Sequence, residues 1–186
     1  MKKVLISGFE PFGSHAENSS QVIAEIFKEV DLLGFEIRII ILPVTFKSAF
    51  ELLKTEIEKF GPDYVLCLGL AGERTSITLE RVAINLIHSK IPDNDGVIYL
   101  DQVILQNGPA AYFSTLPLEK IRELKTAFPV EESYTAGTYV CNYLMYNVLN
   151  FFKDSDVKAG FIHLPHLKEN RGPIHQAIVD ILKYSL

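Results

Sequence analysis

The sequence is poor in cysteine: its 186 residues include two cysteines, two methionines and no tryptophan. Two cysteines cannot build the disulfide framework that stabilises small secreted proteins. Basic residues are also few, with 18 Lys and Arg against 23 Asp and Glu, which gives a formal net charge of −5. A surface that binds nucleic acid needs a stripe of Lys and Arg, and the chain has no such run. We therefore expect no nucleic-acid partner.

Long apolar runs are missing as well. The longest uncharged, mostly apolar stretch, Tyr64 to Gly72, is about half of the ~20 residues that a membrane-spanning helix needs. Near the N-terminus, the apolar residues Val4 to Phe9 stop at Glu10, which is too short for the core of a signal peptide. We therefore expect a cytoplasmic protein with no membrane partner.

Several common catalytic motifs are absent from the sequence. It has no Gly-rich phosphate loop followed by Lys and Ser or Thr, no Gly-x-Gly-x-x-Gly after the first predicted strand, and no Gly-x-Ser-x-Gly. The His-Glu-x-x-His and paired Cys-x-x-Cys spacings of zinc sites are missing too. These absences argue against nucleotide-driven and metal-assisted chemistry and favour thiol chemistry.

What the chain does contain is typical of a globular α/β protein. Hydrophobic residues make up 48% and charged residues 22%, and the length suits one domain, residues 1–186. Short apolar runs alternate with helical periodicity, which predicts a sheet with helices on both faces. Strands are expected at Val4–Ser7, Phe35–Leu42, Tyr64–Leu70, Val97–Leu105, Val130–Thr135 and Lys158–Leu164, whereas Ile77–Ile91 has β-branched character but carries the charged residues Glu80 and Arg81. Helices are expected from Asn18 to about Val30, from Thr45 to Phe60, at Pro117–Phe128, from Gly137 to about Phe152 and at Ile174–Leu186.

Two reactive residues fall at the carboxyl ends of predicted strands, where α/β proteins bind ligands. Cys141 lies in the first turn of a predicted helix, whose partial positive charge would lower the pKa of the thiol. His163 lies near the end of the next strand and would serve as its base. Spacing alone does not choose between His163 and His166, and Cys141 is equally compatible with a small core residue.

The remaining candidates have simpler interpretations. Cys67, in the middle of an apolar strand, is expected in the core, and His15 and His175 are expected to face solvent. Taken alone, Glu80 is expected to form a surface ion pair with its neighbour Arg81.

Four short segments follow one another in a distinctive order. The first is Gly8-Phe9-Glu10-Pro11-Phe12-Gly13, directly after the first predicted strand. The others are Glu80-Arg81-Val82-Ala83-Ile84-Asn85, Ser133-Tyr134-Thr135-Ala136-Gly137-Thr138-Tyr139-Val140-Cys141-Asn142 and Phe161-Ile162-His163-Leu164-Pro165. Together they resemble the pyroglutamyl peptidase I (pyrrolidone-carboxylate peptidase) family of cysteine exopeptidases, and the resemblance runs from Lys3 to Pro165.

The resemblance implies roles for three residues. Cys141 becomes the nucleophile, His163 its base in preference to His166, and Glu80 the group that orients the imidazole. It further implies a single α/β/α domain with a twisted sheet, no cofactor, a cytosolic location and a homo-oligomer, often a tetramer. The expected activity is release of pyroglutamate from the N-terminus of peptides through a thioester intermediate.

The resemblance also implies a substrate pocket. Pyroglutamate is a flat, neutral lactam, which calls for apolar or aromatic walls and few polar groups. The resemblance puts the rings of Phe9 and Phe12 against the lactam. The other expected substrate-binding residues are Thr45, Leu70, Ala71, Lys90, Ile91, Tyr139 and Val140, and the Cys141 amide and the Gly69–Gly72 turn are expected to stabilise the oxyanion.

The chain departs from the family pattern in a few places. Glu73 replaces a glycine that is usual before Arg74, Lys90 stands where many relatives have arginine, and the segment after His163 is shorter than in most members. One alternative is therefore a pyroglutamyl-peptide-binding protein of the same fold that has lost catalysis. A second is another hydrolase or transferase on a similar sheet, such as a nucleoside phosphorylase-like enzyme, which would need a phosphate-binding set of residues.

Overall fold

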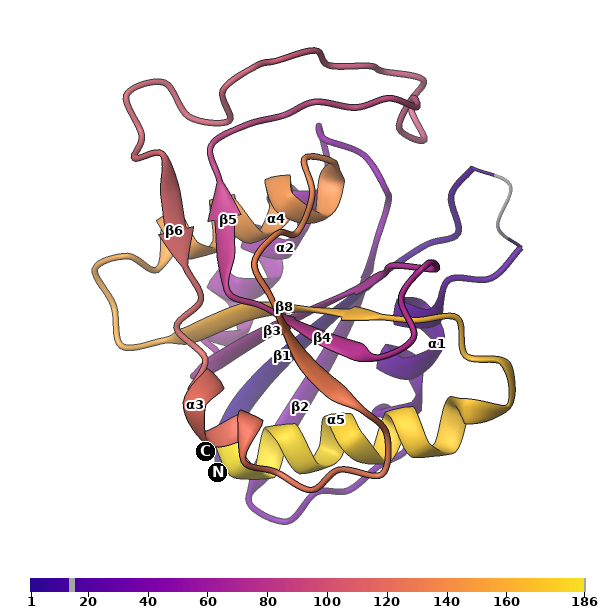
Figure 1. Ribbon diagram of the computed structural model, residues 1–186. Coiled ribbons are helices and arrows are strands. Elements are labelled where there is room, and N and C mark those ends of the chain that lie inside the picture. Colours follow the sequence, from indigo (N-terminus) through magenta and orange to yellow (C-terminus); the bar gives the residue numbers. More distant parts are fainter. Residues whose placement is uncertain (14–15, 186) are drawn as a thin grey trace.

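A six-stranded sheet forms the centre of the computed structural model, which describes residues 1–13 and 16–185 (Figure 1). The strand order is β2-β1-β3-β8-β4-β7. These strands are β1 (Lys2–Phe9), β2 (Phe35–Leu42), β3 (Tyr64–Leu70), β4 (Ile77–Glu80), β7 (Val130–Ser133) and β8 (Lys158–Leu164). The predicted position of His15 lies outside the described residues.

The sheet is mixed but mostly parallel. Strands β2, β1, β3 and β8 all run in the same direction. Strand β4 is antiparallel to β8, and β7 is parallel to β4. The central strands β3 and β8 are buried along almost their whole length, as expected for strands covered on both faces. The predicted α/β fold with a mostly parallel sheet is confirmed.

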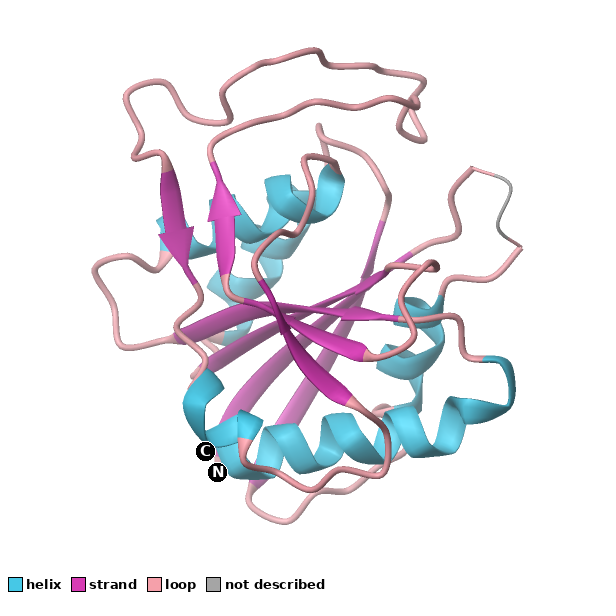
Figure 2. Cartoon of the chain, in the orientation of Figure 1, coloured by secondary structure: helices cyan, strands magenta, loops and turns pink. Residues whose placement is uncertain are grey.

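Helices cover both faces of the sheet (Figures 1 and 2). On one face α2 (Ala49–Phe60) and α4 (Val140–Phe151) pack on side chains such as Leu5, Val65 and Phe161. On the other face, α1 (Ser19–Ile26), α3 (Leu118–Arg122) and α5 (Arg171–Ser185) pack on the alternate side chains of the same strands. The two-residue period of a strand thus divides the apolar residues into two separate cores.

A two-stranded antiparallel sheet of β5 (Val82–Ile84) and β6 (Ala111–Phe113) packs beside α4. The long segment between these strands was predicted to contain a strand at Val97–Leu105, and that prediction is wrong. An isolated bridge joins Ile87 to Gln102. Val97, Ile98, Leu100, Val103 and Leu105 are exposed, so their β propensity is not supported by packing on a neighbouring strand.

Other predicted boundaries are corrected more modestly. The helix expected at Pro117–Phe128 is shorter in the structure, where only α3 (Leu118–Arg122) is helical, because few residues beyond Ile121 reach the core. The helix expected from Thr45 begins at Ala49, with Ser48 as its N-cap. The Thr45 hydroxyl accepts a hydrogen bond from the Ser48 amide in the turn before that helix. His175 is half-buried on α5 rather than solvent-facing, with its ring 4.8 Å from that of Phe27, and burial lowers its pKa.

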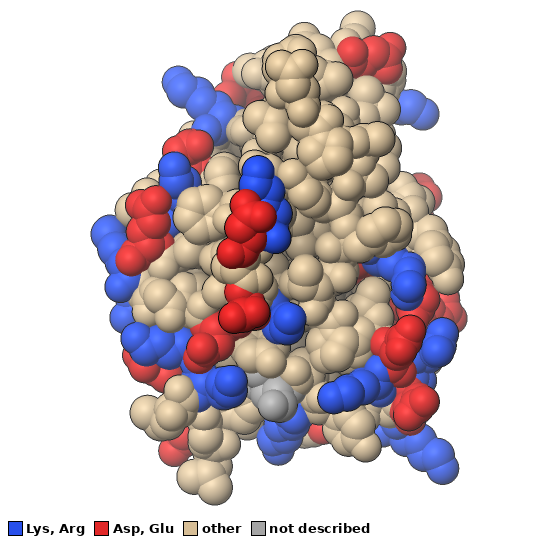
Figure 3. Space-filling view, turned by 90° about the vertical axis from the view of Figure 1, so that its left-hand side faces the viewer, with Lys and Arg blue, Asp and Glu red and all other residues tan. Residues whose placement is uncertain are grey.

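Charges of both signs are interspersed on the face shown in Figure 3, and uncharged residues predominate in its upper part. In the described part of the chain, no helix is both long and apolar enough to cross a membrane.

Candidate active site

The approach of α4 to the sheet positions Cys141. This residue lies in the first turn of α4, above Gly69 on β3. A Cβ atom on Gly69 would lie 2.7 Å from the ring of Phe161 and 3.1 Å from Cys141 Sγ. Only glycine at position 69 therefore lets the sulfur sit this close to the strand ends.

Strand register brings Glu80 to His163. In the antiparallel pair, Thr78 is opposite His163 and Glu80 is opposite Phe161, so all four side chains lie on the face covered by α4. From this diagonal position Glu80 Oε1 lies 2.7 Å from His163 Nδ1. Glu80 is completely buried and His163 is nearly so. Glu80 is therefore not the surface partner of Arg81 that its sequence position alone suggested; Arg81 instead lies 3.6 Å from Glu132 on β7.

Cys141 and His163 both line a cavity of about 140 Å³. Its other walls come from Phe9, Phe12, Asn18, Val44, Leu70, Ala136 and Tyr139. The ring of Phe12 lies 6.4 Å from that of Tyr139, so two neighbouring aromatic rings are part of the wall. An apolar cavity of ~150 Å³ can hold one benzene ring, which makes this space suitable for a single small ring.

The structure brings together part of the predicted site. Glu80, Cys141 and His163 lie together, and Phe9, Phe12, Leu70 and Tyr139 line the adjoining cavity. Five predicted binding residues do not line it: Thr45, Ala71, Lys90, Ile91 and Val140. Thr45 and Val140 are buried, Lys90 and Ile91 are exposed, and the Ala71 amide donates to Leu164 O at 2.9 Å.

The two departures Glu73 and Lys90 lie away from this cavity. Both side chains are exposed. Glu73 borders a separate cavity together with His166 and Lys168. Neither departure therefore occupies the space beside Cys141.

The local environment sets the protonation states of the three groups. Burial raises the pKa of Cys141 to about 12, the charge of Glu80 adds to this, and the charge of Arg74 opposes it. Burial also lowers the pKa of His163, against the influence of Glu80. For Glu80, burial alone would raise the pKa, but the hydrogen bond from His163, the charge that His163 carries when protonated, and the hydrogen bond from Arg74 lower it overall. The resting site thus holds a neutral thiol, a neutral imidazole and a carboxylate, and the thiolate expected from the helix N-terminus is not supported.

This protonation state predicts how the thiol reacts with iodoacetamide. The thiolate is the reactive form, so with a pKa near 12 the rate of Cys141 alkylation should rise about tenfold per pH unit between pH 7 and 9. Mass spectrometry of the carbamidomethylated peptide would follow the rate, with the Cys141→Ala variant as the control for labelling of Cys67. A fast rate that is independent of pH between pH 5 and 8 would contradict the prediction.

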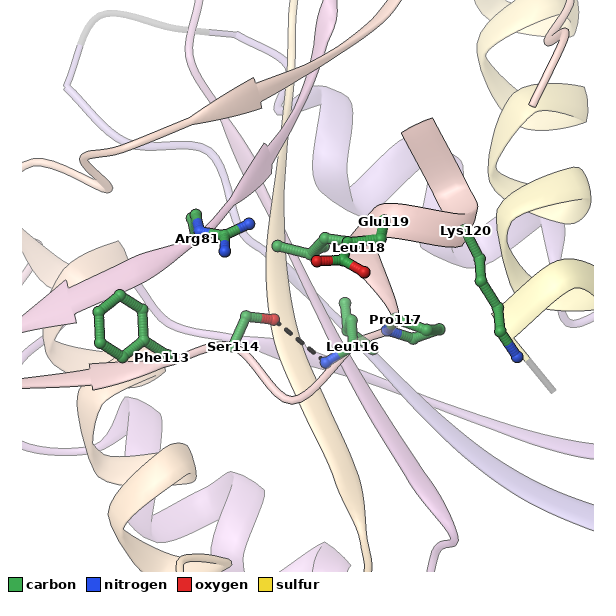
Figure 4. Close-up of a pocket in the computed structure, with 8 residues that line it drawn as sticks. All are labelled: Arg81, Phe113, Ser114, Leu116, Pro117, Leu118, Glu119 and Lys120. Atoms are coloured by element: carbon green, nitrogen blue, oxygen red, sulfur yellow. Dashed lines mark hydrogen bonds between the residues drawn. The ribbon is translucent and has the colours of Figure 1, made fainter. Parts of the chain in front are cut away.

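A larger cavity, of about 320 Å³, lies near the start of α3 (Figure 4). Arg81, Phe113, Ser114 and Glu119 are among the residues that line it. Ser114 Oγ accepts a hydrogen bond from the Leu116 amide at 3.3 Å. No cysteine or histidine lines it, so the smaller cavity is the better candidate for an active site. Within the described residues, no group of three or more His, Cys, Asp or Glu side chains could hold a metal ion.

Two residues of the site were missed by the sequence analysis. Asn18 was noted only as the start of a predicted helix, and it is the N-cap of α1, since its Oδ1 accepts a hydrogen bond from the Ser20 amide; it also lines the cavity. Arg74 was noted only as the neighbour of Glu73, and its guanidinium lies 2.5 Å from Glu80 Oε1. A buried acid implies a partner, but the sequence does not reveal which arginine supplies it.

Comparisons with known proteins agree with this site. The family model described as pyroglutamyl peptidase matches residues 2–179. The pyrrolidone-carboxylate peptidase of Brevibacillus brevis is 45% identical over 175 residues, which cover 91% of this chain and 80% of that protein.

Solved structures show the same fold. Pyroglutamyl peptidase I of Bacillus amyloliquefaciens superposes with a TM-score of 0.92 at 34% identity, covering 100% of this chain and 97% of that one. The pyrrolidone carboxyl peptidase of Fervidobacterium islandicum gives a TM-score of 0.94 at 35% identity, covering 98% of this chain and 97% of that one. With its sequence, its fold and the arrangement of Cys141, His163 and Glu80 all in agreement, the chain belongs to the pyroglutamyl peptidase family.

Proposed function

We propose that residues 1–186 act as one peptidase domain in which Cys141, His163 and Glu80 hydrolyse the bond after an N-terminal pyroglutamyl residue. The enzyme is a cysteine peptidase that removes pyroglutamate from peptides. The assignment of these three residues rests on one observation: a cysteine and a histidine oriented by a buried carboxylate line a ring-sized cavity with phenylalanine walls.

The first half of the reaction forms a thioester. His163 takes the proton of the Cys141 thiol as Sγ attacks the carbonyl carbon of pyroglutamate. The Glu80 carboxylate stabilises the imidazolium that forms and keeps the proton of the resting imidazole on Nδ1. The tetrahedral intermediate collapses when the imidazolium gives its proton to the departing amine, which leaves the acyl group on sulfur.

Backbone N–H groups supply the charge stabilisation. The N-cap of α4 is Tyr139, and its side chain makes no capping hydrogen bond, so no cap side chain competes with an oxyanion for the first N–H groups of the helix, among them that of Cys141. Each such donor is worth ~3–4 kcal/mol in comparable enzymes. In the second half of the reaction, His163 deprotonates a water molecule that attacks the thioester carbon, and the Cys141 thiol is regenerated with release of pyroglutamate.

Asn18 is our choice for a polar contact with the lactam. Its Oδ1 accepts from Ser20, and one N–H of its Nδ2 donates to Glu10 O at 2.9 Å. The second N–H has no acceptor within the described residues, and the side chain faces the cavity. We propose that it donates to the ring carbonyl of pyroglutamate. Loss of such a partner inside a buried pocket is penalised strongly, which selects against proline.

Replacing Asn18 by serine tests this contact. Serine keeps an oxygen for the helix cap, but its shorter side chain has no N–H group to donate to the lactam. We expect kcat/KM for a pyroglutamyl amide to fall roughly tenfold to hundredfold, while the thermal unfolding temperature changes little. The matched control is Asn94→Ser. The Asn94 side chain also donates a hydrogen bond to a backbone carbonyl of the β1–α1 connection, that of Pro11, but Asn94 does not line the cavity. Equal kinetics for the two variants would refute the contact.

We also propose that the enzyme works in the cytoplasm as a homo-oligomer, a tetramer or a dimer. A thiol nucleophile has to remain reduced, which suits that compartment. Support for self-association comes from the exposed apolar side chains of Val97, Ile98, Leu100, Val103 and Leu105 in one segment, since monomeric proteins seldom leave such clusters uncovered.

The direct test of the proposed function is release of a fluorescent amine from a pyroglutamyl amide. The matching prolyl and glutamyl amides serve as controls for selectivity, and iodoacetamide treatment as the control for thiol dependence. We expect release from the pyroglutamyl amide alone, and its loss after alkylation. Folded, reduced protein that releases no amine would overturn the proposal and favour a binding protein.

A further inference from the structure

The guanidinium of Arg74 shares an oxygen atom with the histidine of the site. Arg74 Nη1 lies 2.5 Å from Glu80 Oε1, the same atom that lies 2.7 Å from His163 Nδ1. Nη1 also contacts the hydroxyl of Thr78, and Nη2 donates to the carbonyl of Thr135 at 3.1 Å. The guanidinium of Arg74 therefore binds two side chains through Nη1 and one backbone carbonyl through Nη2.

These contacts join three segments of the chain. Arg74 belongs to the connection between β3 and β4, whereas Thr78 and Glu80 are two residues apart on β4 and project from the same face. Thr135 belongs to the connection between β7 and α4, which leads through Ala136 to Cys141. Arg74 thus links the carboxylate to the segment that carries a pocket wall and the nucleophile.

The exposure of the two partners differs sharply. The Glu80 side chain is 0% exposed, and that of Arg74 is 27% exposed. A buried carboxylate is costly unless positive or hydrogen-bonding groups compensate it. His163 is neutral in the resting site, so Arg74 is the cation that balances Glu80 there.

We propose that Arg74 is a positioning residue of the hydrolysis: it fixes the Glu80 carboxylate against His163 and keeps it charged while the imidazole receives and returns the thiol proton. The inference rests on the proposed function of the three residues. Arg74 does not line the cavity beside Cys141, so it acts on the reaction through Glu80 and not by binding substrate.

The charged groups around His163 set the expected pH effect. Glu80 faces it from β4, Arg74 from the β3–β4 connection, and the thiols of Cys141 and Cys67 lie on α4 and β3. The positive charge of Arg74 lowers the pKa of His163, and its hydrogen bond lowers that of Glu80. Removing Arg74 raises both pKa values. His163 and Glu80 then become protonated at higher pH, and protonated His163 cannot take the thiol proton.

The experiment compares the pH profiles of three variants on a pyroglutamyl amide. For Arg74→Met we expect kcat to fall ten- to hundredfold, an unchanged KM, and an acid limb of kcat/KM displaced to higher pH. Arg74→Lys keeps the charge but not the planar fork, so its acid limb should stay in place while kcat falls. Arg81→Met is the matched control, because Arg81 is the next arginine in sequence and, among the described residues, its guanidinium forms an ion pair with Glu132 and with no other acid; its profile should equal that of the parent.

A double-mutant cycle measures whether the losses of activity caused by changing Arg74 and Glu80 depend on each other, which a purely structural role of Arg74 would not produce. If Arg74 acts through Glu80, then Arg74→Met should cause little further loss in a Glu80→Gln enzyme. Additive losses, or a parental acid limb in Arg74→Met, would overturn the proposal. If Arg74→Met does not fold, Arg74→Lys and Thr78→Val decide instead: lower kcat at parental KM supports the proposal, and parental kcat in both overturns it. A parent enzyme that releases no pyroglutamate would count against the proposed function itself.

Discussion

Cys141→Ala protein is expected to fold normally and to release pyroglutamate at least ~10⁴-fold more slowly than the parent. Cys141 supplies the sulfur that lines the cavity beside His163, and without it no thioester forms. The remaining oxyanion donors and substrate contacts account for whatever rate over the uncatalysed reaction persists. Steady-state release of a fluorescent amine measures the loss, and circular dichroism verifies the fold.

Cys67→Ala is the matched control for that experiment. Cys67 is 1% exposed on β3, and burial raises its pKa to about 12, so it has no access to substrate. Its replacement should leave kcat/KM within about twofold and cost about 1 kcal/mol of stability. If the Cys67 variant were inactive and the Cys141 variant active, our assignment of the nucleophile would be wrong.

Glu80→Gln is expected to lower kcat by roughly 10³–10⁴-fold. Glutamine has nearly the same shape as glutamate and can still hydrogen-bond to His163 and Arg74. It cannot supply the negative charge that stabilises the imidazolium, and the uncompensated Arg74 cation would then oppose that charge. KM should stay close to the parental value, because Glu80 does not line the cavity. Stopped-flow measurement of a single turnover would locate the loss in the acylation step.

Glu132→Gln is the matching control, since Glu132 is also an acid of the main sheet that faces arginines. It lies on β7, 3.6 Å from Arg81 and 3.8 Å from Arg122, and does not line the cavity. Its kinetics should equal those of the parent. A Glu80→Gln enzyme with parental kcat would show that the buried carboxylate is structural and has no part in the reaction.

Much of this architecture could be predicted from local signals in the sequence. Strands β2, β3 and β8 were expected at the bounds that the structure has, because each is a short, mainly apolar segment, and Pro43 and Pro165 directly follow β2 and β8. Gly61 takes a left-handed conformation with φ 62° at the end of α2, as a glycine after a helix commonly does. The same local rules failed at Val97–Leu105, where β-branched residues lie on the surface.

The site itself was harder to predict, because its geometry depends on long-range register. The sequence indicates a cysteine and a histidine at strand ends, but the pairing of Thr78 with His163 joins residues far apart in the chain. The antiparallel direction of β4 within a mostly parallel sheet has no local signature. Without that register, neither Arg74 nor the burial of Glu80 could be deduced, nor could the raised pKa of Cys141, which depends on packing.

The antiparallel pairing of β4 with β8 has an evolutionary consequence. The backbone ladder of the sheet interior sets the spacing of the two strand positions that carry Glu80 and His163. Phe12 and Asn18, which help to shape the cavity beside Cys141, belong to the connection between β1 and α1, outside the ladder. Insertions or exchanges in this connection leave the pairing of Glu80 with His163 undisturbed, so a lineage can change which N-terminal group is removed while it inherits the orientation of the catalytic histidine.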